Sequence, residues 1–456
     1  MEEFNAFISS VSGLLWGPPM LILLVGTGLF LTIRLRGIQV RGLFRGIKIL
    51  FKKDKQEKGD ISQFSALMLS LGATVGIGNI VGVATAIALG GPGAIFWMWA
   101  TGLVGMATKY SESLLAVKYR EKGANGYKGG AMYYITKGLN MPKLGMAFAI
   151  LTIVASFGIG NMTQANAVAT VLFDQVQIPT WTTGIVLVVL TGMVLIGGIK
   201  SVGKFTAYFS PFMVLLYICT ASFIIVTNFD QVPTAFGLIF DHAFAPIAAA
   251  GGFTGAAIAA TIRMGVSRGL FSNEAGLGSS AIAAAAAKTS NPVKQALVSM
   301  LQTLIDTLIV CTMTALVILM APIWMEAGSP GVLTLKSFEY FLGNTGMIVV
   351  FAATVFFAYS TLLGWSYFGE KGFEYVFGEK FVKFYRFIFL IFIMVGAVTQ
   401  LKFVWSFSDL ANGLMAIPNL IALLLLSKVI VEETKKYYFA TDLDEIPEVS
   451  PAMGKK

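Results

Sequence analysis

The sequence has few charged side chains and few of the residues that build catalytic or metal centres. Asp, Glu, Lys and Arg make up 12% of its 456 residues, where soluble domains contain roughly 25%. It holds one histidine and two cysteines, and both cysteines lie in apolar stretches without CxxC spacing. These features exclude a zinc site and a disulfide framework. HExxH and GxSxG motifs are also missing, so we expect neither an enzyme nor a bound cofactor.

Hydrophobic residues, in contrast, make up 56% of the chain and gather in long runs. Windows of about 20 apolar residues, the length that crosses a bilayer as a helix, identify the spans. We therefore predict an all-α polytopic membrane protein with 11 transmembrane helices. The predicted spans are 11–33, 61–89, 92–118, 143–173, 178–199, 204–227, 257–289, 296–321, 346–370, 384–400 and 404–427.

The net charge of +9 is explained by membrane topology better than by nucleic-acid binding. Nine Lys and Arg residues lie in the loop 34–58, whereas the loops on the opposite side have almost none. Cytoplasmic loops are enriched in Lys and Arg. We therefore predict a multi-pass protein of the cell membrane with its N-terminus outside and its C-terminus in the cytoplasm.

The second predicted span contains glycines that make a continuous helix unfavourable. Residues 71–84 read Leu-Gly-Ala-Thr-Val-Gly-Ile-Gly-Asn-Ile-Val-Gly-Val-Ala. A break within lipid leaves backbone N–H and C=O groups unpaired, so it is tolerated only where it is buried in protein or lines a polar cavity. Freed amides suit a carboxylate and freed carbonyls suit a cation. The residues expected to bind substrate here are Thr74, Val75, Gly76, Gly78 and Asn79. A phosphate-binding loop is excluded, because no Lys follows the glycines.

The same pattern returns two hundred positions later. Gly76-Ile77-Gly78-Asn79 matches Gly276-Leu277-Gly278-Ser279, and Pro92 matches Pro292. Such matched, interrupted segments are typical of secondary transporters with inverted repeats; alternatively, the glycines serve only close helix packing.

We predict one extra N-terminal helix and a five-plus-five inverted repeat with two discontinuous helices. The segments are 1–60 (extra helix and basic loop), 61–228 (first repeat), 229–256 (extracellular loop with an amphipathic turn and the lone His242), 257–428 (second repeat) and 429–456 (cytoplasmic tail).

The seventh span places Asn273, Glu274 and Gly276 at its break. An acidic residue at membrane depth indicates function, so Glu274 is a candidate partner for a substrate ammonium, a cation or a proton. The structural alternative pairs Glu274 with Arg268 or Arg263.

Two further spans supply polar candidates. In the fourth, Asn161, Gln164 and Val168 follow one another at helical spacing, which predicts one wall of a binding site; interhelical hydrogen bonding is the alternative for both amides. In the ninth, the adjacent hydroxyls of Ser360 and Thr361 suit a monovalent cation, although such hydroxyls usually bond back to their own helix. Trp365, one turn later, either walls the pocket or is an ordinary buried aromatic residue.

Several strings resemble those of one transporter family. Residues 90–101, Gly-Gly-Pro-Gly-Ala-Ile-Phe-Trp-Met-Trp-Ala-Thr, resemble the signature of the alanine or glycine:cation symporters, also called sodium:alanine symporters. The stretches 160–166, 269–279 and 305–312 look like further hallmarks. Many members have Pro and His shortly after the second hallmark, where this chain has Ser280-Ala281. The resemblance implies the fold of the leucine transporter and sodium-driven uptake of a small neutral amino acid.

On that fold, the resemblance implies that the carbonyls of Gly72 and Val75 join Ser360 and Thr361 around sodium. Alanine or glycine would bind between the two breaks, with its ammonium at Asn273 or Glu274. Proton-coupled transport through Glu274 is the alternative. The matched breaks argue against a channel, and the last 28 residues are too short for the signalling domain of a sensor. We expect no nucleic acid and no obligatory protein partner.

Overall fold

The computed structural model describes residues 2–51, 58–123, 126–244, 254–325 and 330–438. It is helical apart from one hairpin, formed by β1 (Glu121–Gly123) and β2 (Gly126–Lys128). Among the described residues, six helices are long and apolar enough to cross a membrane, and one bent pair makes a seventh span. The helical, polytopic class is therefore confirmed, whereas the number of eleven spans stays a prediction.

The second and seventh predicted spans are both interrupted. The second consists of α5 (Gln63–Thr74), η1 (Ile77–Asn79) and α6 (Val81–Gly90), and the chain bends by 60° at the break. The seventh consists of α14 (Thr254–Asn273) and α15 (Ser280–Ala285). The glycine-rich stretches therefore break where the sequence predicted.

Two other spans contain a π-helical turn, which the sequence analysis did not predict. The fourth consists of α9 (Pro142–Phe157), η2 (Gly158–Met162) and α10 (Thr163–Val176). The eighth consists of α16 (Pro292–Ser299), α17 (Leu301–Thr303), η4 (Leu304–Cys311) and α18 (Thr312–Met320). A π turn adds a residue to the helical period and rotates the side chains that follow it.

The remaining long helices agree with the predicted spans to within several residues. They are α7 (Ala94–Lys118), α11 (Thr180–Leu195), α12 (Gly198–Thr227), α20 (Asn344–Phe377), α21 (Val382–Val398) and α22 (Leu401–Leu425). Short helices connect them: α3 (Ile38–Arg41), α4 (Leu43–Leu50), α8 (Ala131–Gly138), η3 (Phe229–Gln231), η5 (Pro322–Met325) and η6 (Glu379–Phe381). The broken helices lie centrally, since α5 packs against α12 and α20, and α14 packs against α6 and α7.

The N-terminal region differs from the predicted span 11–33. Two helices are present, α1 (Glu2–Leu15) and α2 (Pro18–Arg34). Prolines at the first helical positions fix the start of α2, because a proline has no N–H with which to continue the preceding helix. The helix α1 instead packs along α22.

Three helices lie where we expected loops or a tail. The outer loop 229–256 contains α13 (Val232–Phe244), which packs on α7; residues 245–253 lie outside the described part. The stretch between the eighth and ninth spans holds α19 (Pro330–Leu342), and the tail begins with α23 (Ser427–Tyr438). Short segments with one buried apolar face form such helices by packing against the rest of the protein.

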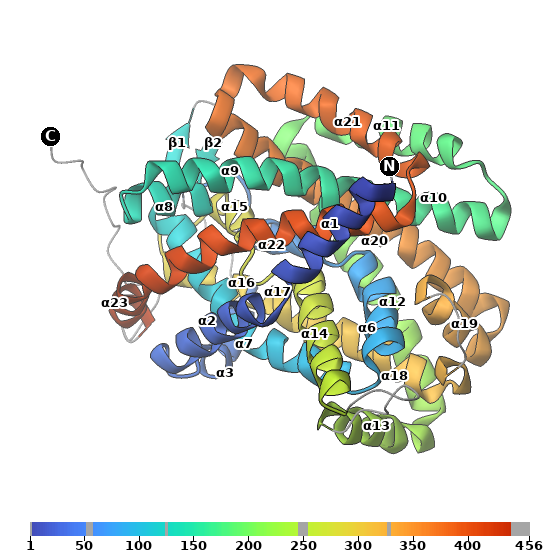
Figure 1. The fold of residues 1–456 in the computed structure, drawn as a ribbon. Helices are drawn as coiled ribbons and strands as arrows, with labels where there is room; N and C mark the ends of the chain where they lie inside the picture. Colours follow the sequence, from blue (N-terminus) through green and yellow to red (C-terminus); the bar gives the residue numbers. More distant parts are fainter. Residues whose placement is uncertain (1, 52–57, 124–125, 245–253, 326–329, 439–456) are drawn as a thin grey trace, which may run out of the picture.

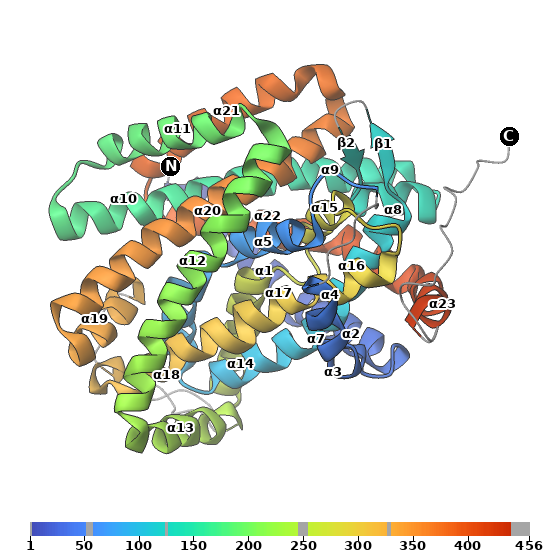
Figure 2. The ribbon, with the colours of Figure 1, turned by 180° about the vertical axis from the view of Figure 1, so that it is seen from behind.

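The connecting segments sort to two ends of the molecule. In Figure 1 the hairpin, α8 and α23 lie at the left, whereas α13 and α19 lie at the lower right. Figure 2 shows the same separation from behind. The hairpin, α8 and α23, which the distribution of Lys and Arg assigns to the cytoplasmic side, therefore lie at the same end of the molecule.

Candidate functional site

The first break is closed by a side chain from its own turn. The helix α5 ends at Thr74, and Val75 and Gly76 are extended. The backbone N–H of Gly76 donates to Asn79 Oδ1 at 3.0 Å. The N–H of Gly76 therefore has a partner within the protein in this structure, and its contact with a substrate carboxylate stays a prediction.

Asn79 also joins the first break to the second. Its Nδ2 donates to Ser272 Oγ at 3.0 Å and to Asp306 Oδ1 at 2.9 Å. Asp306 Oδ2 accepts from Ser272 Oγ at 2.7 Å and from Thr307 Oγ1 at 2.8 Å. Asp306, on η4, was missed by the sequence analysis, although an acidic residue inside an apolar span is the signal that selected Glu274.

The second break is held by a carboxylate of α7. Glu112 Oε1 accepts from the backbone N–H groups of Gly276 and Gly278, each at 3.0 Å, and from Asn419 Nδ2 at 2.7 Å. Gly276 and Gly278 have φ of 94° and 78°, which glycine adopts without strain. The amide of Gly276 is therefore satisfied by Glu112, and a role for Gly276 in substrate binding stays a prediction.

Glu274 lies at the same break in a left-handed conformation, with φ of 55°. Its side chain is buried, and its oxygens accept from Ser279 Oγ at 2.6 Å and Trp365 Nε1 at 2.7 Å. Arg268 instead pairs with Asp409 at 2.7 Å. In the part of the chain that the structure describes, no Lys or Arg forms a salt bridge with Glu274, so the alternative pairing with Arg268 or Arg263 is wrong.

Thr74 and Asn273 are brought together by Gln302 of α17. Gln302 Nε2 donates to Thr74 Oγ1 at 2.9 Å and to the carbonyl of Asn273 at 3.1 Å. Asn273 Nδ2 donates to Thr307 Oγ1 at 3.0 Å. Gln302 Oε1 is buried without a hydrogen-bond partner. The sequence analysis did not select Gln302, because one amide in an apolar helix is a weak signal.

The fourth span presents only part of its predicted wall. Asn161 Nδ2 donates to the Phe389 carbonyl of α21 at 2.7 Å, which is the interhelical bonding that we gave as the alternative for this amide. Gln164 bonds to the Ile159 carbonyl at 3.0 Å. A Cβ at Gly76 would lie 3.3 Å from Gln164 Oε1, which is buried and has no partner. Gln164 therefore faces the first break. Val168 is fully buried.

The predicted cation ligands lie together between α5 and α20. Thr361 Oγ1 is 3.3 Å from the Gly72 carbonyl and donates to the Phe357 carbonyl at 3.0 Å. A Cβ at Gly72 would lie 2.5 Å from Ser360 Oγ and 2.7 Å from Ser210 Oγ. Ser210, on α12, is an additional hydroxyl that the sequence analysis did not select. Val75 follows α5 directly and is buried.

This donor set consists of hydroxyls and carbonyls, without carboxylates. Neutral oxygen ligands suit a weakly held hard monovalent cation better than a transition metal. Among the described residues, no group of three or more His, Cys, Asp or Glu is placed to hold a metal ion. The arrangement therefore fits a transported cation.

Comparisons with known proteins identify the family. The sequence model of the sodium:alanine symporter family matches residues 1–450. The chain belongs to the sodium:alanine symporter family. This family consists of transporters, so the chain is a multi-pass membrane protein of a symporter family and not an enzyme.

Two curated relatives cover nearly the whole chain. The sodium/alanine symporter AgcS of Methanococcus maripaludis is 50% identical, covering 95% of this chain and 97% of its own. The probable sodium/glutamine symporter GlnT of Bacillus subtilis is 40% identical, covering 96% of this chain and 91% of its own. Among solved structures, MhsT in complex with L-phenylalanine aligns with a TM-score of 0.63 at 14% identity, covering 83% of this chain and 93% of MhsT. This last likeness shows the fold alone, which is that of a leucine-transporter-type symporter.

Proposed function

We propose that this sodium:alanine symporter family member takes up a small neutral amino acid, alanine or glycine, together with sodium. The observation that supports it most is the contact of α20 with both breaks. Thr361 approaches Gly72 at the first break, and Trp365 bonds to Glu274 at the second. One helix thus links the proposed cation site to the proposed substrate site.

The substrate is proposed to bind between the breaks. Gln164 and Gln302 carry buried amide oxygens without partners there, and such acceptors suit an ammonium group. Glu274 supplies a carboxylate nearby. The bound state would be stabilised by sodium at Gly72, Val75, Ser360 and Thr361, and rocking of one repeat against the other would alternate access. The N-terminus is proposed to lie outside the cell membrane and the C-terminus in the cytoplasm.

The experiment is uptake of labelled alanine into proteoliposomes that hold the purified protein. An inward sodium gradient is compared with an equal potassium gradient at fixed pH and voltage. Accumulation that requires sodium supports the proposal. Equal uptake with either cation contradicts it, and labelled glycine and glutamine in the same assay define the substrate range.

Proton coupling through Glu274 is the second candidate. It is favoured by one observation: the buried carboxyl group has hydroxyl and indole partners, while the described residues offer it no salt bridge. A carboxyl group in such a setting is suited to carrying a proton. Uptake that ignores sodium but stops when the pH gradient is collapsed would select this candidate.

A further inference from the structure

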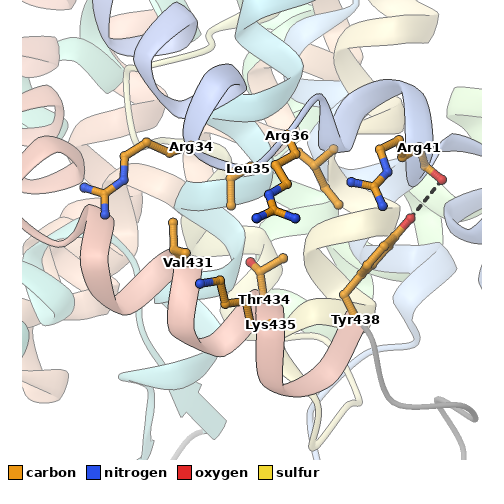
Figure 3. Close-up of a pocket in the computed structure, with 9 residues that line it drawn as sticks. Arg34, Leu35, Arg36, Arg41, Val431, Thr434, Lys435 and Tyr438 are labelled. Carbon is orange, nitrogen blue, oxygen red and sulfur yellow. Dashed lines mark hydrogen bonds between the residues drawn. The ribbon is translucent and has the colours of Figure 1, made fainter.

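A small basic pocket lies outside the transport site, where the turn between α2 and α3 faces α23 (Figure 3). Its walls include Arg34, Arg36, Arg41 and Lys435, and no carboxylate is among the described residues that line it. The space is about 40 Å³. That volume holds roughly three water-sized groups, which leaves room for the two unesterified oxygens of a phosphodiester. We call it the basic pocket.

The backbone at the end of α2 places Arg36 over this pocket. The N–H of Gly37 donates to the Thr32 carbonyl at 2.8 Å, and the N–H of Arg36 donates to the Ile33 carbonyl at 3.0 Å. This pattern is a Schellman motif, whose left-handed position is normally taken by glycine. Here Arg36 occupies it with φ of 55°. The chain therefore puts a cationic side chain where glycine would be less strained, and Figure 3 shows it reaching toward Thr434.

Polar contacts hold the two walls of the basic pocket together. Arg34 NH1 donates to Ser427 Oγ of α23 at 3.0 Å. At the other end, Tyr438 OH donates to the Arg41 carbonyl at 2.9 Å, the dashed bond in Figure 3. Because both ends of α23 are attached to the α2–α3 region, the two walls of this surface pocket are held in place. Membrane topology alone needs basic residues on one side, but it does not need them to converge.

Exposed apolar residues lie next to the residues of the basic pocket in the sequence. Ile33, Val40 and Phe44 are 68%, 67% and 80% exposed. They belong to the end of the predicted first span and to the short helices that follow it. Large apolar side chains beside basic residues are typical of helices at a membrane surface. A soluble anion would use only the charges, whereas a phospholipid would use both the charges and these apolar side chains.

We propose that the basic pocket binds the phosphate group of an anionic phospholipid in the cytoplasmic leaflet. The inference uses the orientation proposed above and is otherwise independent of which amino acid or cation is transported. Arg36 and Lys435 contact the phosphate, Arg34 is positioned beside it by Ser427, and the acyl chains lie along Ile33 and Phe44. Basic pockets at the cytoplasmic ends of transmembrane helices suit such headgroups.

The test measures lipid binding to the delipidated full-length protein by native mass spectrometry. Phosphatidylglycerol is compared with phosphatidylcholine, for the unchanged chain and for the double variant Arg36→Gln/Lys435→Gln. We expect phosphatidylglycerol to bind the unchanged chain preferentially. The double variant should bind it about 30-fold more weakly, which corresponds to about 2 kcal/mol for two surface cations.

Two further variants make the result specific. Lys143→Gln/Lys383→Gln removes the same charge from exposed positions that the topology assigns to the same face, and it should leave binding unchanged. Arg36→Lys/Lys435→Arg keeps the charge and should retain binding. Equal losses in both Gln double variants, or equal binding of both lipids, would overturn the proposal. Displacement of the lipid by inorganic phosphate at equal concentration would assign the pocket to free anions and also overturn it.

Discussion

Trp365 on α20 donates a hydrogen bond of 2.7 Å from Nε1 to Oε1 of Glu274 at the second break. Four residues earlier on the same helix, Thr361 approaches the carbonyl of Gly72 at the first break. A helix holds residues at this spacing on one face. A shift of α20 therefore changes the geometry of the proposed cation site and of the buried carboxyl group together.

Replacing Trp365 with Phe removes this indole donor and keeps an aromatic ring. We expect alanine uptake at equal expression to fall by about tenfold or more, because an unpaired buried acceptor costs about 1–3 kcal/mol. Trp99→Phe is the matched control, since Trp99 Nε1 makes a bond of the same 2.7 Å length to Thr312 Oγ1 away from the breaks. Equal losses in both variants would show that the Glu274 contact has no special role.

A methyl group at Gly72 should block the proposed cation site. The Cβ of Gly72→Ala would lie 2.5 Å from Ser360 Oγ and 2.7 Å from Ser210 Oγ. We expect uptake to fall by about tenfold or more, since overpacking costs about 1–3 kcal/mol, and the remaining uptake to lose its sodium dependence. Gly82→Ala, whose Cβ would meet no atom within 4 Å, should transport normally. Normal sodium dependence in Gly72→Ala would contradict the site.

Asn79 is expected to be essential because it connects three parts of the site. Asn79→Ala removes the acceptor of the Gly76 N–H and the donor to Oδ1 of Asp306. Uptake should fall by about tenfold or more, given the cost of unpaired buried groups. Asn228→Ala removes only local bonds at the end of α12 and serves as the control. Unchanged uptake in both Asn79→Ala and Glu274→Ala, at equal expression, would refute the proposed substrate site.

Glu112 is expected to stabilise the fold through the second break. Glu112→Ala removes the acceptor of the backbone N–H groups of Gly276 and Gly278 and of one side-chain N–H of Asn419. We expect a loss of roughly 3 kcal/mol or more, about 1 kcal/mol for each stranded donor. Glu112→Gln keeps an accepting oxygen and should recover most of it. Thermal unfolding of the purified variants checks this, and an unchanged midpoint for Glu112→Ala would be inconsistent with the bonding described.

The sequence predicted the helical class, both breaks and the grouping of Gly72 with Ser360 and Thr361. Those features follow from apolar periodicity, from glycines inside long spans and from the family resemblance. Apolar periodicity and glycines inside a span are local signals. The grouping across α5 and α20 was accessible only through the resemblance, because sequence spacing gives no contact between distant helices.

The failures have a common physical origin in backbone geometry. A π turn has no strong composition signal, so the irregular period at Gly158–Met162 was not predicted. At the first break we expected free amides, yet Asn79 accepts from the N–H of Gly76. At the second break, Glu112 accepts from the N–H of Gly276 in the same way. Buried backbone groups are nearly always paired within the protein. A break in a helix therefore indicates first that a side chain of the protein bonds to the freed backbone groups, and only then that a ligand does.

The central claim is that sodium beside Thr361 and an amino acid between the breaks stabilise each other. Isothermal titration of alanine into the purified protein, in sodium and then in potassium, measures this coupling for the unchanged chain and for Thr361→Val. We predict that sodium raises alanine affinity by about tenfold or more in the unchanged chain and not in Thr361→Val, as expected for coupled sites. Equal affinity in the two salts, or a sodium effect that persists in Thr361→Val, would contradict the account.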